Sequence, residues 1–153
     1  MSAPHVLRFS MEELGPLMRG YLEEGKSLRF TPKGTSMLPM LREEIDSVVL
    51  SPVSNPLRLY DIPLYQDSQG RYVLHRIVAT MADGYICRGD NTYQNECVPH
   101  GQIVAVITAF YRGEKKITTD AGCYRLYCRL WCGLYPVRRF LYRGINWLRR
   151  HMK

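Results

Sequence analysis

Two side chains of this 153-residue sequence have the types and setting needed for nucleophilic attack on a carbonyl group. Ser36 lies in the stretch GTSMLPML, where a turn beside a glycine exposes a hydroxyl together with nearby backbone N–H groups. A serine hydroxyl attacks a carbonyl carbon poorly unless a neighbouring base removes its proton. His75, in the apolar stretch VLHRIV, is the candidate base. The alternative for His75 is a structural histidine whose ring is satisfied by a hydrogen bond.

Other kinds of site find no support in the sequence. It contains no GxGxxG, no P-loop, no H-E-x-x-H and no EF-hand loop. The four histidines are dispersed and the five cysteines include no C-x-x-C pair, so neither a metal nor an organic cofactor is expected. An odd number of cysteines also gives no paired disulfide framework, which predicts reduced thiols and a cytoplasmic location.

The elements that must position these two side chains are predicted to be strands, over residues 27–119. Short runs rich in β-branched and aromatic residues alternate there with Gly, Pro, Asn and Asp, which predicts a mostly antiparallel β-domain. The segment before it, 1–26, is predicted to hold one helix, because Ser10 and Glu13 have capping-box spacing and apolar residues follow at helical intervals. The runs predicted as strands are SLRFTP, DSVVLSPV, DIPLY, YVLHRIVATM, GYICR and QIVAVITAFYR, with a hairpin at RGEKK.

The C-terminal segment, residues 120–153, accounts for the net charge of +7. Residues 123–153 hold seven arginines and one lysine without any Asp or Glu, whereas 13 basic and 14 acidic residues nearly cancel elsewhere. Leucines and aromatic residues are interleaved with the arginines at helical spacing, and Gly133 with Pro136 is predicted to divide the segment into two amphipathic helices. Such a segment indicates an anionic partner, namely a lipid surface, nucleic acid or an acidic peptide; the alternative is a solvated helix face.

No stretch of the sequence has the length of a membrane span. The longest clearly apolar run, IVAVITAF, is far too short, and the first residues lack the apolar run of a signal peptide. Attachment to a membrane through the basic segment is therefore expected to be peripheral.

Several motifs, taken in order, make the chain similar to a known group of enzymes. GTSMLP, YDIPLY, VLHRIV, RGDN and QIVAVI follow one another as in the signal peptidase I superfamily of serine endopeptidases, over about residues 28–111. Within the superfamily the chain most resembles the small bacterial proteins that lack the usual membrane anchor. The resemblance implies a mainly β catalytic domain, α+β overall with its N-terminal helix and basic helical extension. It also implies a peptide or protein substrate and no cofactor; no nucleic-acid partner is expected.

The resemblance assigns roles to residues of two motifs. Ser36 matches the nucleophile, and Met37 and Pro39 match the residues that shape its turn. His75 stands where the typical bacterial enzyme has a lysine base, as in the archaeal and endoplasmic-reticulum type. The resemblance therefore implies an imidazole base.

The third member of the site lies between two acidic candidates. Members with a histidine base have an Asp shortly after the GDN motif, and the stretch RGDNTYQNE places Asn95 and Glu96 there. Glu96 is the candidate that orients the imidazole, and Asp90 is the alternative. Asp90 and Asn91 are also good turn formers, which gives both of them a structural alternative.

The oxyanion donors are predicted to differ from those of many relatives. The family often has a hydroxyl residue two positions before the nucleophile, where this chain has Gly34. The backbone N–H of Ser36 remains, together with the backbone or hydroxyl of Thr35.

The expected function is that of a serine endopeptidase acting on a leader-like or signal-like peptide. The alternative keeps the fold without the reaction: an idle module that binds a peptide or a membrane surface. The expected location is cytoplasmic, with attachment to the inner membrane surface if the basic segment binds lipid.

Overall fold

The computed structural model describes residues 11–152, which form an α+β protein with about 31% strand and 30% helix. All the strand pairs are antiparallel. The elements, in chain order, are α1 (Met11–Glu23), β1 (Leu28–Phe30), β2 (Ser47–Ser51), β3 (Pro63–Gln66), β4 (Tyr72–Leu74), β5 (Arg76–Thr80), β6 (Gly84–Arg88), β7 (Glu96–Pro99), the 3-10 turn η1 (His100–Gln102), β8 (Ile103–Arg112), β9 (Lys115–Thr118), α2 (Gly122–Gly133) and α3 (Tyr135–His151).

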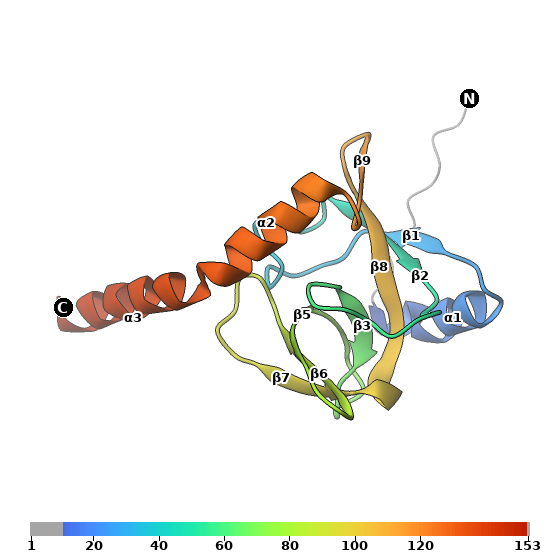
Figure 1. Cartoon of the computed structure of the whole chain (residues 1–153), viewed down its shortest axis with the longest axis horizontal. Helices are drawn as coiled ribbons and strands as arrows, with labels where there is room; N and C mark the ends of the chain where they lie inside the picture. Colours follow the sequence, from blue (N-terminus) through green and yellow to red (C-terminus); the bar gives the residue numbers. More distant parts are fainter. Residues whose placement is uncertain (1–10, 153) are drawn as a thin grey trace.

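Two sheets share the long strand region. The larger sheet has the order β1-β2-β8-β3-β4, with β9 also paired to β8, and the smaller sheet has the order β5-β6-β7. Strand β8 is the spine of the larger sheet (Figure 1), because its first half pairs with β3 and its second half pairs with β2 and β9. Strand β7 is not among the predicted strands, because its four residues, ECVP, show no clear apolar alternation. In the structure Val98 is its one buried residue.

The run YVLHRIVATM, predicted as one strand, is two strands in different sheets. Strand β4 pairs with β3 as far as Leu74, which lies opposite Leu64. Strand β5 begins at Arg76, which pairs with Arg88 of β6. His75 lies at the point where the chain crosses from one sheet to the other. The crossing is what allows residues of both sheets to surround its ring.

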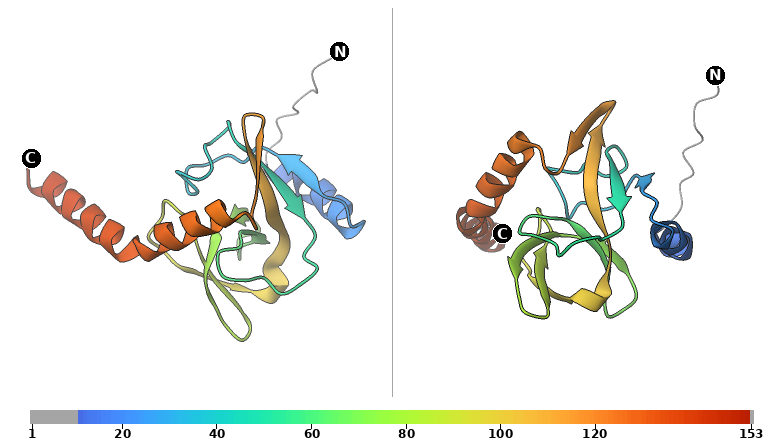
Figure 2. Two further views of the ribbon diagram at one scale, coloured as in Figure 1. Left: turned by 45° about the horizontal axis from the view of Figure 1, so that its top comes forward. Right: turned by 45° about the vertical axis from the view of Figure 1, so that its right-hand side comes forward.

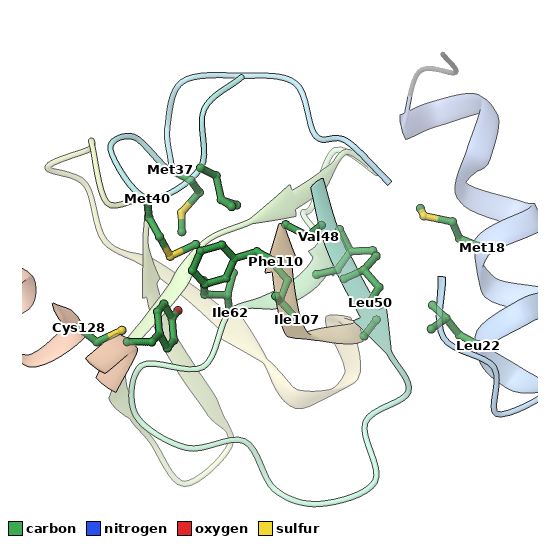
Figure 3. Close-up of a cluster of buried hydrophobic side chains, with 14 residues drawn as sticks. Met18, Leu22, Met37, Met40, Val48, Leu50, Ile62, Ile107, Phe110 and Cys128 are labelled. Carbon is green, nitrogen blue, oxygen red and sulfur yellow. The ribbon is translucent and has the colours of Figure 1, made fainter. Parts of the chain in front are cut away.

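The main hydrophobic core joins all three predicted segments of the chain. Helix α1 contributes Met18 and Leu22, and α2 contributes Tyr124 and Cys128, on opposite sides of the strands (Figures 1, 2 and 3). Burial of a large apolar side chain contributes about 1.5–3 kcal/mol, so these few residues hold each helix against the sheet. A smaller cluster lies between the two sheets, around Tyr65, Ile77, Cys87 and Val98.

The helices follow the predictions in type but not in every face. The proposed cap Ser10 lies outside the described residues. In α1 only part of the predicted apolar face is covered, since Leu17 and Tyr21 are exposed. The break near Gly133 is confirmed: α2 ends there and α3 starts at Tyr135, with Pro136 in its first turn.

Within residues 11–152, no helix combines the length and the apolar composition that crossing a bilayer requires.

Candidate active site

The loop that carries Ser36 connects β1 to β2, and the buried side chain of Met37 holds it against the main core. Met37 is buried in the main core, while the Ser36 residue itself is half-buried at the surface. Gly34 has a φ of 102°, a backbone conformation that is strained for residues with a side chain. Its N–H donates to the Glu43 carboxylate at 2.8 Å. The Leu38–Pro39 peptide bond is cis. Position 34 of this chain therefore favours glycine over a residue with a side chain.

A second loop, residues 89–95, brings the Ser36 loop next to His75. The backbone N–H of Asn91 donates to the Ser36 carbonyl at 2.8 Å, and its side-chain amide donates to the Thr35 carbonyl at 3.2 Å. A Cβ on Gly89 would lie 2.6 Å from the Ser36 carbonyl oxygen and 3.1 Å from Cδ2 of His75. Only glycine fits between them, so the close approach of the serine loop to the imidazole depends on Gly89.

The His75 ring is held through Nδ1. Nδ1 lies 3.1 Å from Oε2 of Glu96 and 3.2 Å from the Tyr65 hydroxyl, and that hydroxyl also contacts Oε2. Burial, and then the hydrogen bond to Glu96, raise the pKa of Tyr65 far above its ordinary value. The phenol therefore stays protonated and donates a hydrogen bond to the carboxylate. Both partners then accept from the ring. The ring proton therefore sits on Nδ1, and Nε2 is left as a base.

Ser36, His75 and Glu96 line the same cavity, which has a volume of about 360 Å³. Within residues 11–152, Nε2 of His75 makes no hydrogen bond, and the Ser36 hydroxyl is not bonded to it. Hydrogen bonds between a nucleophile and its base are often long in the free enzyme and tighten when substrate binds. The edge strand β4 forms one wall of the cavity and leads directly into His75.

Asp90 does not contact His75 and pairs instead with Arg76. Two hydrogen bonds of 2.7 Å join the guanidinium and the carboxylate, and the two side chains are 0% and 2% exposed. Burial alone would lower the pKa of Arg76, but the hydrogen bonds and charge of Asp90 outweigh it and raise that pKa. Arg76 also donates to the Tyr124 hydroxyl and to Cys128 Sγ, at 2.8 and 2.9 Å, so it links α2 to the strands.

Two backbone donors remain for an oxyanion. In the described part of the chain the N–H groups of Thr35 and Ser36 donate no hydrogen bond, whereas that of Gly34 is taken by Glu43. Asn95, the neighbour of Glu96, accepts from Arg88 at 3.3 Å and so belongs to the loop rather than to the imidazole.

Three residues of this region lie in the motifs quoted above but were given no role there. Tyr65 and Arg76 each carried a signal, because a phenol or a guanidinium in an apolar strand requires a buried partner. Gly89 stands in the RGDN motif, but nothing in the sequence shows that its lack of a side chain lets the serine loop approach His75. For metals, no group of three His, Cys, Asp or Glu residues within 11–152 is placed to hold an ion.

No protein-family model, no curated protein and no solved structure matches this chain.

Proposed function

We propose that the chain is a serine endopeptidase in which Ser36 is the nucleophile and His75 the general base. The observation that carries the proposal is the setting of the imidazole: Glu96 and Tyr65 hold Nδ1, while Nε2 has no hydrogen-bond partner among residues 11–152 and faces a cavity that Ser36 also lines. This is the arrangement that a serine hydroxyl needs, because the base must be correctly protonated and aimed before it takes a proton. The motif order that resembles the signal peptidase I superfamily supports the same reading and favours a signal-peptidase-like catalytic domain.

The reaction follows from these positions. Nε2 of His75 takes the Ser36 hydroxyl proton as Oγ bonds to the scissile carbonyl carbon, and the carbonyl electron pair moves onto oxygen. The N–H groups of Thr35 and Ser36 stabilise this oxyanion. The imidazolium then gives its proton to the amine nitrogen as the C–N bond breaks, which leaves an acyl group on Ser36. Water, deprotonated by the same nitrogen, then attacks the acyl carbon; the bond between that carbon and Oγ breaks, the imidazolium returns the proton to Oγ, and the peptide leaves with a new carboxyl terminus.

Glu96 and Tyr65 act on the imidazole and not on the substrate. The carboxylate accepts the Nδ1 hydrogen and stabilises the positive charge that His75 acquires during catalysis. The Tyr65 hydroxyl fixes Oε2 in place, because it donates to that same oxygen. Loss of such an orienting acid lowers turnover strongly even when the nucleophile and base remain.

The substrate best suited to this cavity is an extended peptide. In the part of the chain that the structure describes, β4 is at the end of the larger sheet and pairs only with β3, and its three residues line the cavity before His75. A peptide that adds to such an edge places alternate side chains in the cavity and its backbone beside the nucleophile. A leader-like or signal-like peptide fits this description, as the resemblance also implies.

The deciding experiment is mass spectrometry of a mixed peptide library after incubation with the purified chain. New peptide termini are expected with the natural sequence and none with Ser36→Ala or His75→Ala. Ser54→Ala and His100→Ala are the matched controls, since both residues are exposed and lie outside the cavity, and they are expected to cleave normally. Cleavage that survives in Ser36→Ala would refute the mechanism. Binding of peptides without cleavage by the natural chain would favour the idle binding module.

A further inference from the structure

One side of helix α3 packs against the strand region, residues 27–119, and its apolar side faces away from that region and is exposed. We propose that this uncovered side binds the surface of an anionic lipid bilayer, with the helix lying in the plane of the interface. Figure 1 and the left view of Figure 2 show α3 extending beyond the strands, away from both sheets. None of its described side chains is buried.

The side of α3 that touches the strand region is polar and aromatic. The Tyr135 hydroxyl donates to the Tyr93 carbonyl at 3.2 Å, and Arg138 donates to the Asp90 carbonyl at 3.1 Å. The Tyr142 ring stacks on Tyr93, with their centroids 4.5 Å apart. Residues 135, 138 and 142 are spaced by three and four positions, so they mark one face of the helix.

The opposite face is a continuous apolar strip. Val137, Leu141 and Leu148 lie along its centre, and Phe140 and Trp147 flank it on one side with exposures of 77% and 59%. The strip continues onto the outer side of α2, where exposed leucines follow at the same spacing. Its exposed members are Leu126, Leu130, Leu134, Val137, Phe140, Leu141, Ile145, Trp147, Leu148 and Met152.

The charge of the helix points to an anionic surface. No Asp or Glu occurs from residue 121 to 153, and α3 carries five arginines. Of these, Arg138 alone hydrogen-bonds to residues 27–119 in the described part of the chain. Arg139, Arg143 and Arg150 lie on the polar side, where a helix resting on lipid directs its basic residues toward headgroups. Leucine, phenylalanine and tryptophan on the other side are the residues that enter the boundary of the acyl chains.

A second copy of the chain fits this strip less well than lipid does. A coiled-coil seam needs apolar residues at alternating third and fourth positions over several heptads. The register through Val137 and Leu141 is interrupted by Gly144 and His151, and the register from Leu141 to Met152 spans less than two heptads. Pairing two such helices would also bring arginines together without any carboxylate to neutralise them. The apolar strip is wider than a two-residue seam, as in helices that lie on a bilayer.

The test is co-sedimentation of the full chain with vesicles of phosphatidylcholine and phosphatidylglycerol, compared with vesicles of phosphatidylcholine alone. Binding is expected only to the anionic vesicles, and it is expected to weaken as salt is raised. Arg139→Gln combined with Arg150→Gln is expected to lower the partition coefficient about 30-fold, whereas Lys115→Gln with Lys116→Gln, which removes the same charge from β9, leaves it nearly unchanged. Phe140→Ser combined with Trp147→Ser is expected to abolish binding. Its matched control is Leu17→Ser with Ile45→Ser, which changes two apolar residues of similar exposure outside the strip and is expected to leave vesicle binding unchanged.

Tryptophan fluorescence locates the contact. A blue shift on addition of anionic vesicles is expected for the natural chain and not for Trp147→Phe, because Trp131 is half-buried against the strand region. The inference does not rest on the proposed catalysis, so Ser36→Ala is expected to bind vesicles normally. Absence of binding to anionic vesicles at low salt would overturn it, as would undiminished binding by the Phe140 and Trp147 double variant. A lipid-free dimer that the same double variant dissociates would assign the strip to a second copy instead.

Discussion

Two carboxylates that lie six positions apart in the chain have entirely different partners. Glu96 is 43% exposed at its side chain and contacts the Nδ1 edge of His75, whereas Asp90 is buried against the guanidinium of Arg76. An exposed pair contributes about 0–1 kcal/mol to stability, but removal of one member of a buried pair leaves an uncompensated charge. The two residues should therefore separate catalysis from folding.

We predict that Glu96→Gln lowers kcat about a hundredfold or more, because the imidazolium loses the negative charge beside it. Its free energy of unfolding should stay within about 1 kcal/mol of the natural chain. Asp90→Ala should instead lose about 3–5 kcal/mol of that free energy, since Arg76 remains buried without its partner. Urea denaturation together with steady-state kinetics on a confirmed substrate measures both. The assignment is wrong if Asp90→Ala folds normally and Glu96→Gln retains full turnover.

A third carboxylate, Asp46, makes stability depend on pH. Burial alone would raise its pKa, but the hydrogen bonds and charge of Arg42, at 2.7 Å, outweigh it and lower the pKa below the ordinary 3.8. A carboxyl whose pKa is lowered by folding stabilises the native state above the unfolded pKa, and that contribution is lost as pH falls through the folded pKa.

We therefore expect the urea midpoint of the natural chain to fall as pH drops below about 4. Asp46→Asn should be less stable at neutral pH and should lose part of this acid dependence. Asp83→Asn, at an exposed turn, is the control that should follow the natural curve. Identical acid dependence in Asp46→Asn and the natural chain would show that another group is responsible.

At the scale of elements, the end of α2 and the start of α3 hold the loop that positions the site. The Asp90 carbonyl accepts hydrogen bonds from Trp131 Nε1 and from Arg138, both at 3.1 Å. The same loop donates the Asn91 N–H to the Ser36 carbonyl. A short backbone segment thus connects α2 and α3 to the serine loop through hydrogen bonds.

Arg138→Gln is predicted to lower kcat about tenfold, because small displacements of catalytic groups are costly to turnover. KM and the melting temperature should change little, since Arg138 contacts neither the cavity nor the main core. Arg139→Gln removes the same charge from the next residue, which faces solvent, and should leave kcat unchanged. Equal kinetics for the two variants would mean that the helices do not position the loop.

At the scale of the whole molecule, the chain consists of a nearly neutral part, residues 1–119, and the basic C-terminal segment, residues 120–153. The contacts between α3 and the strand region involve Tyr135, Arg138 and Tyr142, all in the first half of the helix. Among the described residues, the helix beyond Tyr142 makes hydrogen bonds and ring contacts only with itself. Helix α2, by contrast, contributes Tyr124 and Cys128 to the main core.

Truncation after Tyr142 is therefore predicted to preserve the melting temperature and the cleavage of free peptides, while it abolishes binding to anionic vesicles. Truncation before Gly122 should destabilise the fold strongly, because it removes two buried side chains and leaves Arg76 without the Tyr124 hydroxyl. Thermal denaturation of both variants checks this. A melting temperature unaffected by the longer truncation would show that α2 is not part of the core.

Local patterns in the sequence were sufficient for the parts of this protein that depend on neighbouring residues. Apolar spacing indicated a helix before the strands and two helices after them, and the break at Gly133 follows from chemistry within one turn. Ser36 and His75 were recognisable as candidates from their own surroundings. The excess of positive charge in residues 120–153 is a property of composition alone.

Tertiary structure decided which groups meet. The split of one predicted strand at His75, the contact with Glu96 rather than Asp90, and the presence of Tyr65 all depend on strand pairing between distant segments. Likewise, helical spacing indicated an apolar side for residues 120–153. Only the packing shows that α2 buries Tyr124 and Cys128 against the strands, whereas none of the described side chains of α3 is buried. The physical reason is that secondary structure is set by local backbone preferences, whereas partner choice for a buried charge or an apolar face is set by long-range packing.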